Sequence, residues 1–141
     1  MIQRIQSIWL LLAAICAFVT YPLVLYVGKL ADGSERQFLL GDHFLLMMSI
    51  IALGVLSLVC IFLFRNRKLQ FRLTILGLVL TVGYVFLQYL MIEQFKKDLT
   101  IQTGSYKVAA LLPLLMIIFL ILAARGIYKD ERLVKSLDRL R

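Results

Sequence analysis

The residues best suited to chemistry form a stripe of small and polar side chains within one apolar segment of the chain. They are three, four, three and four residues apart: Thr74, Gly77, Thr81, Tyr84 and Gln88. This spacing keeps all five on one face of an α-helix. In a membrane, small residues let helices approach closely, and hydroxyl and amide groups form hydrogen bonds between them. We interpret the stripe as a helix-packing surface. The alternative is a ligand or ion path lined by Tyr84 and Gln88.

Other residues that commonly bind metals or catalyse reactions are scattered along the chain. Cys16 and Cys60 each lie inside an apolar segment, which argues against a disulfide framework and a reactive thiol. His43, the single histidine, lies at the edge of an apolar segment, where a hydrated position is more common than a ligand role. The sequence contains no glycine-rich phosphate loop and no paired Cys/His ligand set. We therefore expect no catalytic residue, metal site or cofactor, and a protein that is not an enzyme.

The composition indicates an integral membrane protein. Of the 141 residues, 62% are hydrophobic, and the mean hydropathy is +0.91. Soluble domains have about 45–50% apolar residues. A chain of this length cannot bury the excess in one core, so lipid must cover much of it.

Four apolar segments predict the fold. They cover residues 8–27, 44–64, 73–92 and 108–124, and none contains Asp, Glu, Lys, Arg or His. Twenty helical residues rise about 30 Å, which matches the hydrocarbon thickness of a bilayer. We predict an all-α protein in which residues 1–124 form an antiparallel four-helix transmembrane bundle. Residues 28–42 are expected to form a polar loop, with Asp42 as the N-cap of the second helix.

The last segment, residues 125–141, has a different character. Ile127, Leu133, Val134, Leu137 and Leu140 recur at helical spacing, with basic residues between them. This pattern is typical of an amphipathic helix that lies on an anionic membrane surface or docks on a partner. We therefore predict a C-terminal cytoplasmic amphipathic helix as a second unit of the chain.

The distribution of charge predicts the orientation. If both termini lie on one side of the membrane, that side holds eleven of the sixteen Lys and Arg residues and only three of the eight acids. The positive-inside rule assigns this side to the cytoplasm. The predicted cytoplasmic basic face comprises Arg65, Arg67, Lys68, Arg72, Lys129, Arg132, Lys135, Arg139 and Arg141.

This charge distribution also bounds the partners. The basic segments lack interleaved aromatic residues and match no nucleic-acid-binding module, so no nucleic acid is expected. The expected partners are the lipid bilayer, anionic lipid headgroups, and either a membrane-protein partner or a second copy of the chain.

Three stretches of the chain resemble a known family. They are the opening Met1-Ile-Gln-Arg-Ile-Gln-Ser-Ile-Trp-Leu-Leu-Leu-Ala-Ala14, the middle Arg65-Asn-Arg-Lys-Leu-Gln70, and the close Ala124-Arg-Gly-Ile-Tyr-Lys-Asp-Glu-Arg-Leu-Val-Lys-Ser-Leu-Asp-Arg-Leu-Arg141. Together they resemble a family of small Bacteroidetes membrane proteins, domain of unknown function family 4293. The resemblance covers essentially the whole chain. It implies four spans, a bacterial source and an inner-membrane location, and it supplies no activity or functional residue.

Two functional hypotheses follow from these observations. The leading one is a non-enzymatic accessory or scaffold subunit that docks through its basic cytoplasmic face. The alternative is a small-solute or lipid-handling transporter that uses the stripe of the third span.

Overall fold

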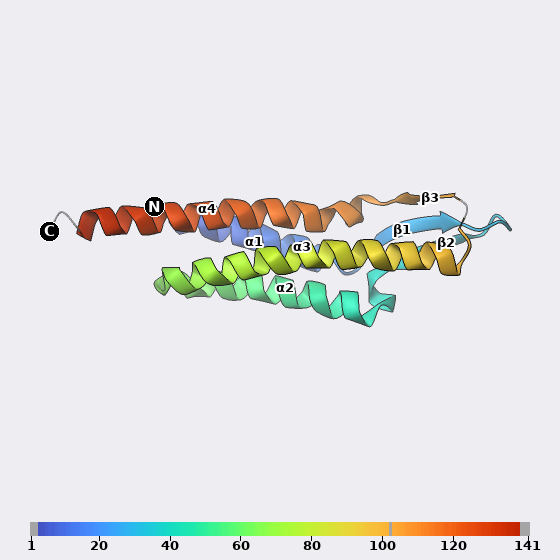
Figure 1. Ribbon diagram of the computed structural model, residues 1–141, viewed down its shortest axis with the longest axis horizontal. Helices are drawn as coiled ribbons and strands as arrows, with labels where there is room; N and C mark the ends of the chain where they lie inside the picture. The colour runs from blue at the N-terminus through green and yellow to red at the C-terminus, as the bar shows by residue number, and fades with distance from the viewer. Residues whose placement is uncertain (1–2, 102, 139–141) are drawn as a thin grey trace.

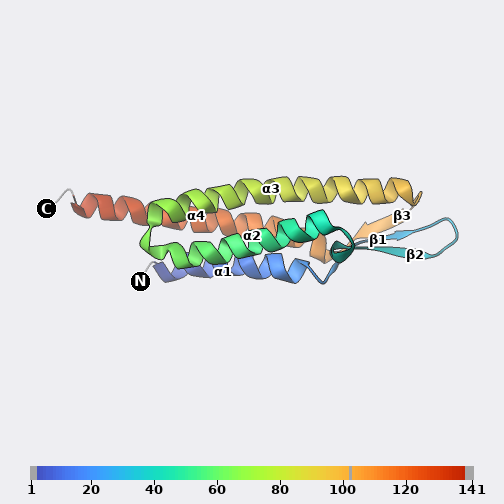
Figure 2. The same cartoon turned by 90° about the horizontal axis from the view of Figure 1, so that it is seen from below.

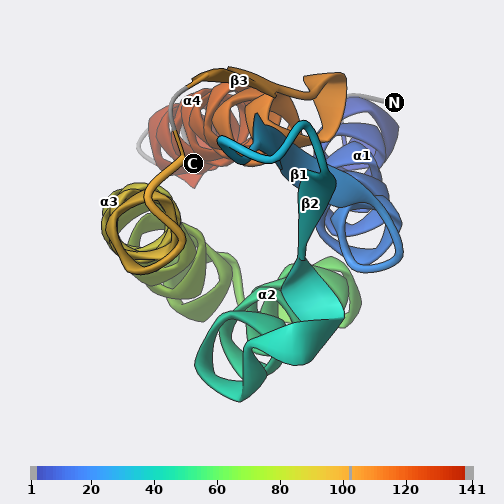
Figure 3. The same cartoon turned by 90° about the vertical axis from the view of Figure 1, so that its right-hand side faces the viewer.

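The computed structural model describes residues 3–101 and 103–138, with side chains described for residues 5–101 and 103–133. Four helices dominate the chain: α1 (Gln3–Thr20), α2 (Phe44–Phe62), α3 (Arg67–Asp98) and α4 (Leu112–Asp138). They form an elongated bundle in which α1 and α3 each pack against both α2 and α4 (Figures 1 and 3). The predicted predominance of helix is confirmed.

Apolar side chains fill the interior of the bundle and also cover its exterior. Leu10 of α1, Ile50 of α2 and Met116 of α4 are fully buried, and in a membrane their van der Waals packing holds the helices together. On the outside, Val79 and Phe86 of α3 are 61% and 63% exposed. An apolar exterior around an apolar core is stable where lipid, rather than water, surrounds the helices.

A three-stranded antiparallel sheet lies at one end of the bundle, an element that the all-α prediction did not include. The strands β1 (Val24–Lys29), β2 (Glu35–Leu39) and β3 (Thr103–Tyr106) pair in the order β2-β1-β3. The expected polar loop, residues 28–42, instead holds the end of β1, all of β2 and a short 3-10 helix, η1 (Leu40–Asp42). The loop between the third and fourth helices supplies β3.

The first apolar segment is divided between a helix and a strand. Residues 8–27 were predicted as one span, yet α1 ends at Thr20 and β1 begins at Val24. Pro22 lies between them, and its ring and missing N–H cannot continue a helix. The residues after it include Val24, Tyr26 and Val27, which favour extended structure. Hydropathy alone does not distinguish such a strand from the last turns of a helix.

The hairpin turn between β1 and β2 depends on a glycine. Gly33 has φ of 79°, a left-handed conformation that glycine adopts without steric cost. The turn is closed by hydrogen bonds from the Gly33 N–H to the Leu30 carbonyl, at 3.1 Å, and from the Leu30 N–H to the Ser34 carbonyl, at 3.0 Å.

The last turns of α3 extend past the other helices and pack on the sheet (Figures 1 and 2). Phe95 contacts Phe38 of β2 edge to face, with ring centroids 5.2 Å apart. The Lys96 Nζ lies 2.6 Å from a Glu93 oxygen and over the rings of Tyr26 and Tyr106. The hydrogen bond to Glu93 raises the pKa of Lys96 above its ordinary value. Lys96 therefore stays charged at neutral pH and joins α3 to β1 and β3.

Two helix starts differ from the sequence prediction. The N-cap of α2 is His43, which makes no side-chain capping bond and stacks on Phe38 at 4.2 Å between ring centroids. Asp42, the predicted cap, instead ends η1.

The predicted fourth span, residues 108–124, begins with the 3-10 helix η3 (Val108–Leu111), and Pro113 falls in the first turn of α4. A proline there costs no hydrogen bond, because the first N–H groups of a helix have no partner within it.

The predicted boundary at residue 124 is absent, because α4 runs unbroken from Leu112 to Asp138. Residues 125–138 therefore continue the fourth helix. The sequence held a signal for this continuity, because residues 123–128 contain no proline and Gly126 is their one weak helix former.

A groove between the second and third helices

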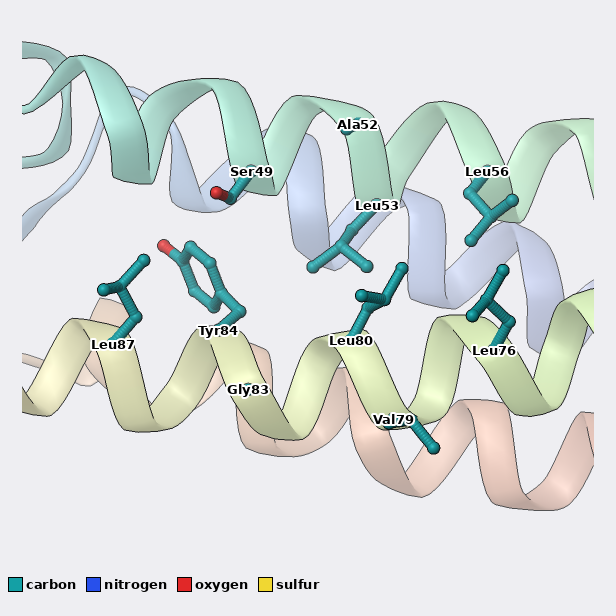
Figure 4. Close-up of a pocket in the computed structure, with 10 residues that line it drawn as sticks. All are labelled: Ser49, Ala52, Leu53, Leu56, Leu76, Val79, Leu80, Gly83, Tyr84 and Leu87. Atoms are coloured by element: carbon teal, nitrogen blue, oxygen red, sulfur yellow. The ribbon is translucent and has the colours of Figure 1, made fainter.

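The helices α2 and α3 diverge as they run from their connection, η2 (Leu63–Arg65), towards the sheet (Figures 1 and 3). A groove of about 700 Å³ fills the space between them. Figure 4 shows the lining residues: Ser49, Ala52, Leu53, Leu56, Leu76, Val79, Leu80, Gly83, Tyr84 and Leu87. None of these ten side chains is charged. The groove belongs to the exterior of the bundle, because Leu76, Val79 and Leu80 are 48%, 61% and 49% exposed.

Tyr84 supplies the one phenol in this lining. Its side chain is 3% exposed, and its ring projects into the groove with the hydroxyl turned towards Ser49 (Figure 4). Within the described part of the chain, this hydroxyl has no hydrogen-bond partner. The Ser49 hydroxyl donates to the Leu45 carbonyl at 2.7 Å. A buried phenol without a partner costs about 1–3 kcal/mol, and the hydroxyl oxygen is itself buried rather than open to the groove.

Gln88 lies one turn further along the same face of α3 and is 6% exposed. Its Nε2 donates to the Ala110 carbonyl in η3 at 3.4 Å, a long hydrogen bond. Its Oε1 has no partner among the described residues. Tyr84 and Gln88 therefore leave one donor and one acceptor unused in the half of the bundle nearest the sheet.

The other three stripe residues have different surroundings. The hydroxyls of Thr74 and Thr81 donate to carbonyls one turn back on α3, at 2.8 and 2.7 Å. A Cβ added at Gly77 would lie 3.4 Å from the Leu56 side chain, so the glycine permits close contact with α2. All five stripe residues are buried. The stripe thus has a packing part at Thr74, Gly77 and Thr81, and a part with unused polar groups at Tyr84 and Gln88.

The residues of the predicted basic face gather at the end of the bundle opposite the sheet, which we call the basic end. Arg65, Lys68 and Arg72 are exposed on η2 and the first turns of α3, and Lys129 and Arg132 are exposed on α4. Arg67 is half-buried, and its Nη1 lies 3.5 Å from the Asp130 carbonyl. The side chain of Lys135 and the residues Arg139 and Arg141 lie outside the described part of the chain.

Sequence reasoning missed a buried polar pair near the basic end. The Gln6 Nε2 of α1 donates to the Asp130 Oδ2 of α4 at 2.5 Å, and the two side chains are 5% and 6% exposed. Gly126, one turn before Asp130, makes room for Gln6, because a Cβ there would lie 2.8 Å from the Gln6 Cγ. Gly126 and Asp130 are one helical turn apart, and this spacing could have indicated a close polar contact with another helix. The prediction of a separate tail from residue 125 assigned both residues to the tail instead.

Sequence reasoning also missed Ser49 and Gly83 of the groove, since neither residue type is unusual in an apolar segment.

The described residues contain no group of three or more His, Cys, Asp or Glu side chains that could hold a metal ion. Within them, three helical segments are long and apolar enough to cross a membrane: Phe44–Arg65, Arg67–Asp98 and Val108–Leu133. Ile5–Thr20 is a shorter apolar helix. Length and composition thus assign the chain to the class of helical membrane proteins.

The family follows from a comparison with protein-family models. The model described as Domain of unknown function (DUF4293) matches residues 2–140, and the chain belongs to this family. No curated protein and no solved structure matches the chain.

Proposed function

We propose that the chain is a non-enzymatic accessory or scaffold subunit that spans a membrane four times and docks a protein partner through its basic end. The observation that carries this proposal is the collection of exposed cations at one end of the bundle. Three of these cations lie on η2 and the first turns of α3: Arg65, Lys68 and Arg72. Two more, Lys129 and Arg132, lie on α4, which is distant in sequence. Such a surface attracts acidic partners and anionic lipid headgroups.

The lengths of the helices support four spans. The 18 residues of α1 rise roughly 27 Å, close to the hydrocarbon thickness of about 30 Å. The 32 residues of α3 rise roughly 48 Å. This is enough to cross the bilayer and carry Lys96 to the sheet beyond it. Because α1 packs along α2 and α4, a membrane that holds those two helices also holds α1.

The positive-inside rule then assigns the basic end, with both termini, to the cytoplasm and the sheet to the opposite side. The resemblance of the chain ends to small Bacteroidetes membrane proteins favours a bacterial inner membrane. In this arrangement the part of α4 beyond the bilayer projects into the cytoplasm, where a partner can contact it.

Charge reversal at the basic end tests the docking proposal. The full chain is purified from native membranes in mild detergent, and a stoichiometric partner is identified. The triple variant Arg65→Glu, Lys68→Glu and Lys129→Glu should lose that partner, because the cations that attract it are reversed. The measurement is the ratio of partner to chain in the eluate.

A matched control reverses charges at the sheet end, with Lys97→Glu and Lys107→Glu, both exposed. This variant should retain the partner. Equal retention by both variants, or the lack of any stoichiometric partner in the unaltered protein, would contradict docking through the basic end.

The groove favours a second candidate function, lipid handling. Its uncharged lining and exposed mouth suit apolar chains better than hydrated solutes. Movement of fluorescent phospholipid between leaflets of vesicles that contain the protein distinguishes this function from docking, because a scaffold subunit leaves the rate unchanged.

A further inference from the structure

We infer that α4 binds the headgroup of an anionic phospholipid from the membrane leaflet at the basic end, in a site made by Tyr128, Lys129 and Arg132. The inference rests on one part of the proposed function, the crossing of a membrane by α4. It needs no protein partner, and it is measured on the purified chain alone. Lipid binding and protein docking can therefore fail independently.

One exposed face of α4 changes from apolar to cationic without a break in the helix. Its members are three, four, three and four residues apart: Ile118, Ile121, Arg125, Tyr128 and Arg132. This spacing keeps them on one side of the helix, and all five are exposed. When α4 crosses a membrane, the apolar part of this face lies against lipid tails. The same face then presents cations where the tails end.

The polar part of this face begins at the depth of lipid headgroups. The headgroup layer adds roughly 5–7 Å on each side of the hydrocarbon core. Tyr128 and Lys129 follow Ala124, the end of the apolar segment, by four and five residues, or roughly 6–8 Å along the axis. The Tyr128 ring centroid lies 6.1 Å from that of Phe71 on α3. The next residue, Arg72, is also exposed, so the cations of both helices begin at the same depth.

The polar side chains of the site converge on one hollow. Tyr128, Lys129, Arg132 and Leu133 line a space of about 380 Å³. The Arg132 guanidinium carbon lies 6.0 Å from the centroid of the Tyr128 ring. Because Tyr128 is one turn nearer the membrane, Arg132 is folded back towards the headgroups. A guanidinium supplies paired donors for two phosphate oxygens, and an ammonium beside it adds a third contact.

The exposed residues around the hollow carry positive charge only. Within the stretch 125–133, the exposed charged residues are Arg125, Lys129 and Arg132. Asp130 is buried and faces α1, and Glu131 is half-buried. An anionic headgroup therefore complements this surface. A zwitterionic headgroup gains less, because it brings an ammonium of its own.

The apolar residues next to the hollow favour a lipid over a soluble anion. Ile118 and Ile121 are 50% and 38% exposed, and they continue the site into the hydrocarbon layer. The acyl chains of a bound phospholipid lie along them while its phosphate contacts Lys129 and Arg132. A soluble phosphate contacts the polar part alone.

Neutralising the two cations tests the site. The full chain in mild detergent is titrated with phosphatidylglycerol or with phosphatidylcholine of identical acyl chains, and native mass spectrometry measures both affinities. The unaltered chain should prefer phosphatidylglycerol. Lys129→Gln with Arg132→Gln should weaken phosphatidylglycerol binding about thirtyfold, since each charge contributes roughly fivefold, and leave phosphatidylcholine binding unchanged. The matched control, Lys97→Gln with Lys107→Gln at the exposed sheet end, should keep the preference.

Three results would overturn the inference. The first is equal affinity of the unaltered chain for the two lipids. The second is unchanged phosphatidylglycerol affinity in the double variant, and loss of a protein partner from that variant would then assign the hollow to the protein. The third is displacement of the lipid by an equal concentration of glycerol phosphate, which would make a soluble phosphate the occupant. Circular dichroism and elution volume verify that the variants fold.

Tyr128 tests how the guanidinium is positioned. Tyr128→Leu removes the ring under Arg132 and should weaken phosphatidylglycerol binding roughly two- to fivefold, the strength of an exposed cation–π contact. Tyr128→Phe keeps the ring and should retain the affinity of the unaltered chain. Thermal unfolding in detergent separates this effect from lost packing on Phe71. Equal affinities in Tyr128→Leu and the unaltered chain would refute positioning by the ring.

Discussion

At the scale of single residues, the buried polar groups differ in how well they are paired. Gln6 and Asp130 pair with each other across α1 and α4, and the Gln70 Nε2 pairs with the Cys60 carbonyl of α2 at 2.9 Å. These contacts hold the bundle together near the basic end. Tyr84 and Gln88, nearer the sheet, retain unused groups. The paired buried groups thus lie nearer the basic end, and the unpaired ones lie nearer the sheet.

The pair of Gln6 and Asp130 gives a prediction about stability. Gln6→Leu removes the amide donor and leaves a buried carboxylate, so the free energy of unfolding should fall by roughly 1.5–3 kcal/mol. The double variant Gln6→Leu and Asp130→Leu should lose less than the sum of the single losses, because the second change removes the stranded group. Detergent-induced unfolding measures these values, with Gln94→Leu at an exposed site as the control. Additive losses would show that the two side chains are not coupled.

Sequence reasoning located the residues of the stripe but not all of their surroundings. The helical spacing of Thr74, Gly77 and Thr81 indicates a common face, and these residues are buried on one face of α3. That Tyr84 faces a groove depends on the divergence of α2 from α3, which no local pattern encodes. The pairing of Gln6 with Asp130 joins residues 124 positions apart, and a single sequence has no periodicity over that distance.

At the scale of elements, helix lengths and ends depend on short-range hydrogen bonds more than on hydropathy. The C-terminus of α3 is an example. The Thr100 N–H donates to the Lys97 carbonyl at 3.2 Å, and the Ile101 N–H donates to the Lys96 carbonyl at 3.0 Å. This is the Schellman arrangement, in which the residue after the helix adopts a left-handed conformation. Here that residue is Thr100, with φ of 47°.

Thr100→Gly should therefore stabilise the protein. A left-handed conformation costs a residue with a Cβ roughly 1–2 kcal/mol, and the greater flexibility of glycine in the unfolded chain offsets roughly 0.5–1 kcal/mol of the gain. The free energy of unfolding should rise by roughly 0.5–1 kcal/mol, measured by thermal unfolding in detergent. Thr103→Gly in β3 is the control and should destabilise, because that strand needs no left-handed residue. Destabilisation by both changes would contradict this explanation of the helix end.

The sheet and the continuous fourth helix mark the limits of prediction at this scale. The apolar run that ends at Val27 satisfied the length of a span, and only Pro22 and the β-branched residues after it indicated a strand. Of the residues predicted as a C-terminal helix, 125–138 are helical as part of α4. The absence of a break from α4 follows from the packing of Ile127 and Asp130, both buried, against the rest of the bundle.

At the scale of the whole molecule, the bundle is polarised along its length. The exposed cations of η2, α3 and α4 lie at one end, and the sheet with the last turns of α3 lies at the other (Figure 1). Apolar surface, including Val79, Phe86 and Ile118, covers the region between them. This arrangement underlies the proposed function, because the positive-inside rule favours a cytoplasmic location for the end that carries the cations.

The orientation of this polarised bundle in the membrane is the central claim, and cysteine accessibility in intact cells tests it most directly. With Cys16 and Cys60 replaced by alanine, single cysteines are introduced at Ser34 in the hairpin turn, at Ser105 in β3 and at Ser136 in α4. An impermeant thiol reagent should label the first two and leave the third unlabelled until the cells are opened. Labelling of Ser136→Cys in intact cells, with Ser34→Cys and Ser105→Cys protected, would contradict the proposed orientation.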